Sequence, residues 1–230
     1  MKAGMAAAMA ALQALNELGI SLSGDVWIEN VVDEEFGGAN GTLACRLKGY
    51  EADLTIIPEP TNLTISPASQ GGAMYRFTYE GTSGRGFSGE KLINPAFAAA
   101  KFIEIFKLYQ AYHADKLSPS PWYNKGDAPA YIQGMQAGSP QYPIYDRSPS
   151  SCSIDVWIQC YPGITAEEQF QDLLDFYAEH ASKDEDLANW PVKSEQLIRF
   201  LPGMEARRSG EVVPFLQALS EQTFAGSLPV

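Results

Sequence analysis

The sequence predicts an α/β protein into which a smaller α+β domain of the ferredoxin-like type is inserted. The main observation is the element order expected for residues 74–200, which is strand, helix, strand, strand, helix, strand. That order is the split β-α-β arrangement. The second observation is that residues 1–70 have a different sequence pattern, which predicts an Ala-rich helix and two apolar strands that are each followed by acidic residues. We therefore expect one domain formed by residues 1–70 and 203–230, and an inserted domain of residues 71–202.

The composition indicates a globular chain that does not bind polyanions. Of the 230 residues, 45% are hydrophobic and 11% aromatic, which is enough to bury one large core or two modest ones. The net charge is −12 and no run of Lys or Arg occurs, so we expect neither a nucleic-acid partner nor binding to an anionic membrane surface. The 3 cysteines are widely spaced and fit reduced thiols, and residues 1–18 lack the pattern of a signal peptide or a membrane span. A cytoplasmic location is expected.

The expected first domain begins with a helix and continues with two strands. Residues 3–18 combine strong helix formers with apolar side chains on almost every face, which predicts a buried helix. Residues 25–32 and 53–57 are rich in β-branched and aromatic side chains and are predicted as strands. A short helix is expected over residues 41–47, and residues 210–223 read as a helix that returns to this domain.

The inserted domain is predicted from alternation and from helix caps. Strands are expected near residues 74–79, 130–135, 153–161 and 192–200. Asn94 and Pro95 open a helix that runs to about Tyr112, and Thr165 with Glu168 forms a capping box for a second helix.

Acidic residues follow both predicted strands of the first domain. Asp33, Glu34 and Glu35 come directly after residues 25–32, and they repel one another unless they are solvated or face a cation. A metal site and a solvated acidic turn are both consistent with this stretch. Glu59 follows residues 53–57 and lies between two prolines, which could hold one carboxylate in a set position. Taken alone, that segment favours a plain Pro-rich turn.

Several motifs together resemble a known enzyme family. The sequence opens with Met-Lys-Ala-Gly, continues with Asp-Glu-Glu-Phe-Gly-Gly at residues 33–38, and then has Ala-Asp at 52–53 and Glu-Pro-Thr at 59–61 before the ferredoxin-like insertion. This ordered set is similar to the co-catalytic zinc hydrolases that include acetylornithine deacetylase, succinyl-diaminopimelate desuccinylase, aminoacylase and carboxypeptidase G. The resemblance spans nearly the whole chain.

The resemblance implies roles for individual residues. Two zinc ions, or cobalt or manganese in their place, would activate a water molecule for attack on an amide. Glu34 would be the general base, Glu35 a ligand of one ion and Glu59 a ligand of the other. Arg85, in the loop after the first strand of the inserted domain, and Asn94 are expected to contact substrate. An exposed loop arginine is the alternative for Arg85.

The departures from the family pattern are also informative. The bridging aspartate would lie one residue before Met1, and the closing histidine would fall beyond Val230. The chain has only 2 histidines, His113 and His180, and both are predicted in or beside helices of the inserted domain. We therefore expect an incomplete and inactive part of a deacylase that acts on an N-acyl amino acid or a peptide-like amide, and a homodimer formed through the inserted lid domain. The alternative is a non-catalytic interaction module derived from this family.

Overall fold

The chain forms two compact units. The structure is a computed structural model that describes residues 2–87, 89, 91–138, 147–207, 209–223 and 229. The first unit comprises Met1–Ser66 with Glu211–Val230, and the second comprises Pro67–Gly210. Within the described ranges, no helix is both long enough and apolar enough to cross a membrane.

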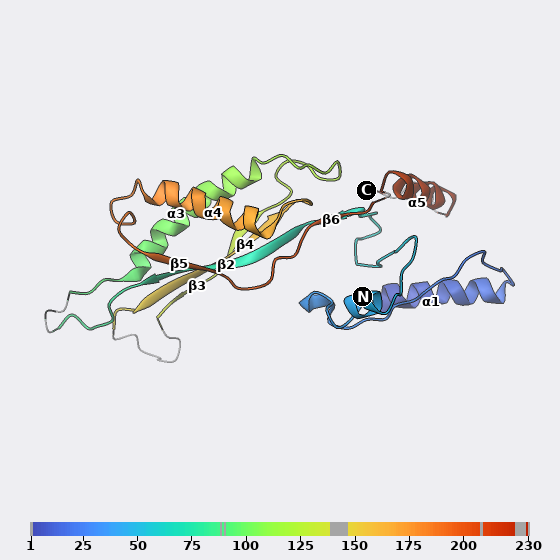
Figure 1. The fold of residues 1–230 in the computed structure, drawn as a ribbon, viewed down its shortest axis with the longest axis horizontal. Helices are drawn as coiled ribbons and strands as arrows, with labels where there is room; N and C mark the ends of the chain where they lie inside the picture. Colours follow the sequence, from blue (N-terminus) through green and yellow to red (C-terminus); the bar gives the residue numbers. More distant parts are fainter. Residues whose placement is uncertain are drawn as a thin grey trace. The chain divides into compact units, whose positions relative to one another are not determined.

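The second unit is a four-stranded antiparallel sheet with two helices on one face (Figure 1). Its elements follow in the order β2 (Gly71–Glu80), α3 (Pro95–Ala114), β3 (Ala130–Ala137), β4 (Ser151–Cys160), α4 (Ala166–Ala181) and β5 (Val192–Gln196). The strands lie side by side in the order β3-β4-β2-β5. This is the ferredoxin-like arrangement that the sequence predicts.

The core of this unit lies between the sheet and the helices. Strands β2 and β4 pair along their full length, from Gly71 opposite Cys160 to Glu80 opposite Ser151. Every second side chain on both strands is buried, as expected for a sheet covered on one face only. The helices add aromatic rings to the same layer, and the ring centroids of Phe77 on β2 and Phe102 on α3 are 4.6 Å apart. Burial of this aromatic and aliphatic layer holds the unit together.

The two helices begin and join through defined polar contacts. Asn94 caps α3, and Thr165 with Glu168 forms the predicted capping box at the start of α4. Further along, the Asp172 carboxylate on α4 accepts hydrogen bonds from the hydroxyls of Tyr109 and Tyr112 of α3, at 3.0 and 2.9 Å. It also forms an ion pair with the Lys116 ammonium at 2.6 Å. These contacts fix α3 and α4 against each other.

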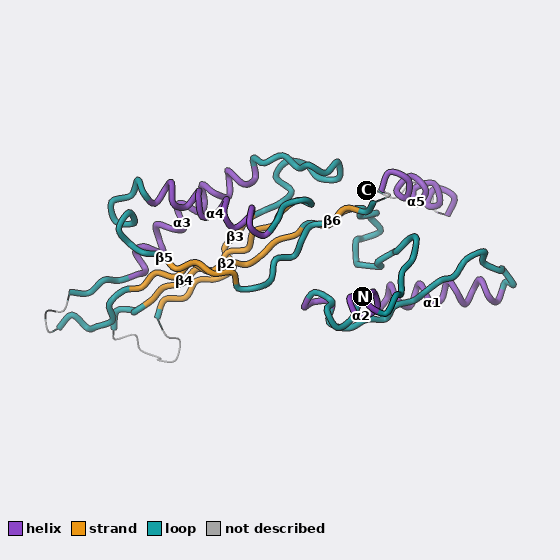
Figure 2. Tube along the Cα trace, viewed as in Figure 1, coloured by secondary structure: helices purple, strands orange, loops and turns teal. Residues whose placement is uncertain are grey.

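The first unit differs from its prediction. It contains α1 (Lys2–Glu17), the 3₁₀ turn η1 (Glu34–Phe36), α2 (Thr42–Leu47) and α5 (Ser209–Thr223). Residues 25–32 and 53–57, predicted as strands, are loops (Figure 2). A strand requires hydrogen bonds to a neighbouring strand, and the described residues provide none there. The predicted burial of α1 is also wrong for this structure, since none of its described residues is buried.

A short strand pair absent from the prediction lies where the chain enters and leaves the second unit. Strand β1 (Ala68–Ser69) pairs with β6 (Met204–Glu205). Beside it, a Cβ atom on Gly71 would lie 2.2 Å from the carbonyl oxygen of Leu201, so only glycine fits at this crossing. Two-residue strands carry too little pattern to be predicted from sequence.

Candidate active site

The three acids at 33–35 lie on one tight turn. Asp33 adopts a left-handed conformation with φ of 69°, which Asp tolerates better than most residues. The amide of Gly38 donates to the carbonyl of Asp33 at 2.7 Å, and the amide of Gly37 donates to that of Glu34 at 2.8 Å. The chain therefore reverses direction directly after the acids, as the two glycines suggest.

The side chains of the three acids are not equivalent. The Asp33 carboxylate accepts a hydrogen bond of 2.8 Å from the side-chain amide of Asn40, which ties it to its own loop. Glu34 and Glu35 are both exposed on η1. The turn thus presents two neighbouring carboxylates to solvent while the third fixes the loop.

The segment before the turn is held by a close backbone contact. A Cβ atom on Gly41 would lie 2.2 Å from the carbonyl oxygen of Val32 and 2.9 Å from Cβ of Val31. Gly41 is buried and directly precedes α2. Only glycine lets the start of α2 pack so closely on the residues that lead into the acids.

Glu59 lies in a second constrained segment of the same unit. Its amide donates to the carbonyl of Ile57 at 2.9 Å, and the amide of Thr61 donates to the carbonyl of Glu59 at 2.8 Å. A Cβ atom on Gly4 would lie 2.6 Å from the carbonyl oxygen of Pro58, so the first turn of α1 packs against the residue before Glu59. The Glu59 side chain is exposed.

The residues predicted as metal ligands do not gather into a complete site. Within the part of the chain that the structure describes, no three His, Cys, Asp or Glu side chains are grouped so as to hold a metal ion. Both histidines lie in the second unit, where ring nitrogens of His113 and His180 contact the carbonyls of Gln159 and Phe176. The described residues therefore do not fit a two-ion site by themselves.

The two predicted substrate residues belong to the second unit. Asn94 accepts a hydrogen bond of 3.0 Å from the amide of Ala96 and serves as the N-cap of α3. Arg85 is exposed in the loop between β2 and α3. That loop is anchored nearby, because the amide of Ser148 donates to the carbonyl of Gly84 at 2.8 Å.

Comparison with known proteins identifies the family. The model of the peptidase family M20/M25/M40 matches residues 1–215. The chain belongs to this family. The resemblance inferred from residues 33–38 and 59–61 is thereby confirmed. Members of the family are hydrolytic amidohydrolases and peptidases that generally use metal ions.

Individual relatives cover this chain to different extents. It is 27% identical over 243 aligned residues to N-formyl-4-amino-5-aminomethyl-2-methylpyrimidine deformylase of Halalkalibacterium halodurans. This alignment covers 99% of this chain and 53% of that protein. The deformylase of the same name from Bacillus subtilis is 39% identical over 74 residues, 32% of this chain and 17% of that protein. The chain thus spans about half the length of the first of these relatives.

A solved structure has a similar fold. It is that of aminopeptidase PepT from Bacillus cereus, with a TM-score of 0.54 and 16% sequence identity. The match covers 100% of this chain and 55% of the PepT chain. At this identity the likeness concerns the fold alone. The mixed α/β class predicted from the sequence is therefore confirmed.

Proposed function

We propose that this chain contributes to a metal-dependent amide hydrolase that removes a small acyl group from an amine. In this proposal the first unit is part of the catalytic domain and the second unit is the lid domain. Glu34 is the general base, and Glu35 and Glu59 are metal ligands. The observation that carries the proposal is the fixed acid turn, with Glu34 and Glu35 exposed side by side, in a chain that belongs to the M20 family.

The proposed work of Glu34 is proton transfer. An ionised carboxylate can take a proton from the water that attacks the amide and later return it to the leaving amine. Both steps need a side chain that water can reach, and Glu34 is exposed on η1. The hydrogen bonds that close the turn support this role, because they limit the positions from which the carboxylate can act.

The metal part of the proposal is limited by the ligand set. Carboxylates alone bind zinc less well than sites that include imidazole. Since the described residues do not form a cluster of three ligands, we expect the 230-residue chain to bind zinc weakly and to hydrolyse amides slowly if at all.

Two substrate classes are proposed. The first is an N-acyl amino acid of the acetylornithine type, which the motifs at 33–38 and 59–61 suggest. The second is a formamide of a heteroaromatic methylamine, which is favoured because both curated relatives described above are deformylases of such a pyrimidine. In both cases a small acyl group leaves an amine nitrogen.

The experiment combines a zinc titration with product release. The chain, its Glu34→Gln, Glu35→Gln and Glu59→Gln variants, and the control Glu29→Gln are titrated with zinc against a competing chelator. Each is then assayed with N-acetylornithine and with N-formyl-4-amino-5-aminomethyl-2-methylpyrimidine. Glu29 is an exposed acid of the same unit and has no proposed role.

The outcomes separate the roles. We expect Glu35→Gln and Glu59→Gln to weaken zinc binding while Glu29→Gln leaves it unchanged. Glu34→Gln should leave zinc binding intact and lower any measurable turnover by about 100-fold or more. Normal turnover by Glu34→Gln contradicts the base assignment, and equal zinc affinities in all variants contradict the ligand assignments. Fast hydrolysis by the unaltered chain contradicts the expected inactivity. Tight dimers without any zinc binding would instead favour the non-catalytic interaction module.

A further inference from the structure

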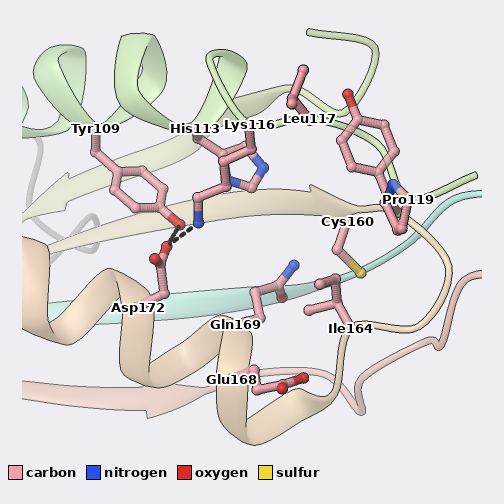
Figure 3. Close-up of a pocket in the computed structure, with 11 residues that line it drawn as sticks. Tyr109, His113, Lys116, Leu117, Pro119, Cys160, Ile164, Glu168, Gln169 and Asp172 are labelled. Atoms are coloured by element: carbon pink, nitrogen blue, oxygen red, sulfur yellow. Dashed lines mark hydrogen bonds and ion pairs between the residues drawn. The ribbon is translucent and has the colours of Figure 1, made fainter. Parts of the chain in front are cut away.

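A cavity of about 260 Å³ lies in the second unit, between the end of α3 and the start of α4 (Figure 3). Tyr109, His113 and Lys116 line it from the α3 side, and Glu168, Gln169 and Asp172 line it from α4. None of the residues that line the cavity is among those assigned to the proposed hydrolytic site. Its volume lies below the range of drug-sized pockets, so it suits a small ligand.

Several polar side chains of the wall make hydrogen bonds with protein groups. The Tyr109 hydroxyl and the Lys116 ammonium both donate to Asp172, at 3.0 and 2.6 Å, and Figure 3 shows the three side chains turned toward one another. Gln169 donates to the carbonyl of Ile158 at 3.2 Å and accepts from the Tyr75 hydroxyl at 2.9 Å. The charge of Lys116 is thus compensated by Asp172, and both ends of the Gln169 amide have partners.

Among the other polar groups of the wall, Glu168 and His113 carry hydrogen-bond acceptors, and Lys116 keeps N–H donors beyond the one bonded to Asp172. One oxygen of Glu168 accepts from the amide of Thr165 at 2.8 Å, and this bond holds the pKa of the Glu168 carboxyl below its usual range, so the side chain is ionised and its other oxygen can accept from a ligand. Nε2 of His113 lies 2.8 Å from the carbonyl of Gln159 and must donate to it, which makes Nδ1 an acceptor. Nδ1 is buried and has no hydrogen-bond partner among the described residues.

The remaining wall is apolar or aromatic. Leu117, Pro119, Cys160 and Ile164 line it, and the ring of Tyr161 adds an aromatic surface. Aromatic rings attract cations, and apolar side chains cover the body of a small organic molecule. The amino end of α4 disfavours a cation, but Glu167 and Glu168 lie in its first turn and oppose that effect.

We propose that this cavity binds a small primary amine in its ammonium form, carried on an apolar or aromatic body. The ammonium donates to Glu168, and the body lies against Ile164 and Tyr161. A ligand whose polar group only accepts hydrogen bonds finds no donor in the Glu168 carboxylate and is disfavoured. The cavity thereby selects for charge as well as for size.

The test uses the 230-residue chain with benzylamine as the probe. Isothermal titration calorimetry measures its affinity beside that of benzyl alcohol, which has a similar shape and no charge. We expect benzylamine to bind with a Kd on the order of 1 mM and benzyl alcohol to bind about tenfold more weakly. Amide shifts in two-dimensional NMR spectra should centre on residues 109–119 and 160–172. Equal affinities for the two probes, or no saturable binding of benzylamine below about 10 mM, would overturn the proposal.

Matched variants test whether the charge of Glu168 binds the ammonium group. Glu168→Gln preserves a capping side chain and removes the charge, so benzylamine affinity should fall about fivefold. Glu167→Gln makes the same change in the same turn at a residue that does not line the cavity, and it should stay within about twofold of the original affinity. Equal effects in both variants contradict the proposal. If Glu168→Gln lowers the melting temperature, Ile164→Phe decides, because it fills the cavity without changing charge and should abolish binding. Retained affinity in that variant also counts against the proposal.

Discussion

The two roles available to Asn94, helix cap and substrate contact, can be separated by substitution. Its side chain accepts one hydrogen bond of 3.0 Å from the amide of Ala96, and Pro95 occupies the first helical position of α3. Asn94→Ala removes that acceptor and leaves one helix amide unpaired. Loss of an N-cap costs about 1 kcal/mol, which corresponds to a fall in Tm of roughly 2–4 °C for a chain of this size.

Thermal and urea unfolding followed by circular dichroism measure this loss. Asn94→Asp is the matched variant. Its carboxylate can still cap the helix and interacts favourably with the helix dipole, and the N–H donors of the Asn side chain are lost. We expect Asn94→Asp to retain full stability. The helix-cap role is contradicted if Asn94→Ala unfolds at the same temperature as the unaltered chain, or if Asn94→Asp loses as much stability as Asn94→Ala. A substrate role predicts in addition that Asn94→Asp raises KM in an active form of the enzyme.

Further predictions concern packing, pH and assembly. Gly4→Ala should destabilise the chain by about 1–3 kcal/mol in urea, because the new Cβ would meet Pro58 at 2.6 Å, although alanine favours helices. Gly210→Ala, with nothing within 4 Å of the new Cβ, should be neutral or stabilising by the same measurement. Burial lowers the pKa of His113 below its usual 6.5. As the pH falls, this histidine therefore becomes protonated in the unfolded state before it does so in the folded state. The urea midpoint should therefore fall as the pH drops below about 6.5, and His113→Gln should reduce that slope. We also propose that β3, an edge strand with Ile132 36% exposed, takes part in a homodimer. Ile132→Lys should then shift the sedimentation coefficient toward the monomer, and an unchanged value contradicts that interface.

The second unit illustrates how much local sequence can predict. The pairs Asn94-Pro95 and Thr165-Glu168 mark helix starts through contacts within three residues, and both caps occur in the structure. Alternation along β4 identifies the buried face without knowledge of its neighbours. These features depend on interactions between residues that are close in sequence, or on a period that any covered sheet imposes.

The geometry of the candidate site depended more on the three-dimensional positions of its residues than on the sequence pattern. The acids at 33–35 and Glu59 could be named from their residue types and from the family resemblance. The left-handed Asp33, its bond to Asn40 and the contact between Gly4 and Pro58 could not, because each depends on backbone positions that sequence does not specify locally. The predicted strands at 25–32 and 53–57 failed for a related reason, since a strand exists only where a partner strand is present.

By itself, the sequence determined the family, the order of the elements in the second unit and the caps of its helices. The sequence also indicated an incomplete ligand set, and the described residues of the folded chain contain no cluster of three metal ligands. Tertiary structure alone decided that a cavity lined by the Glu168 carboxylate forms where α3, β4 and α4 meet. The physical reason is range: caps and periodicity arise from neighbouring residues, whereas a cluster or a cavity arises from side chains that are distant in sequence and become neighbours only when the chain folds.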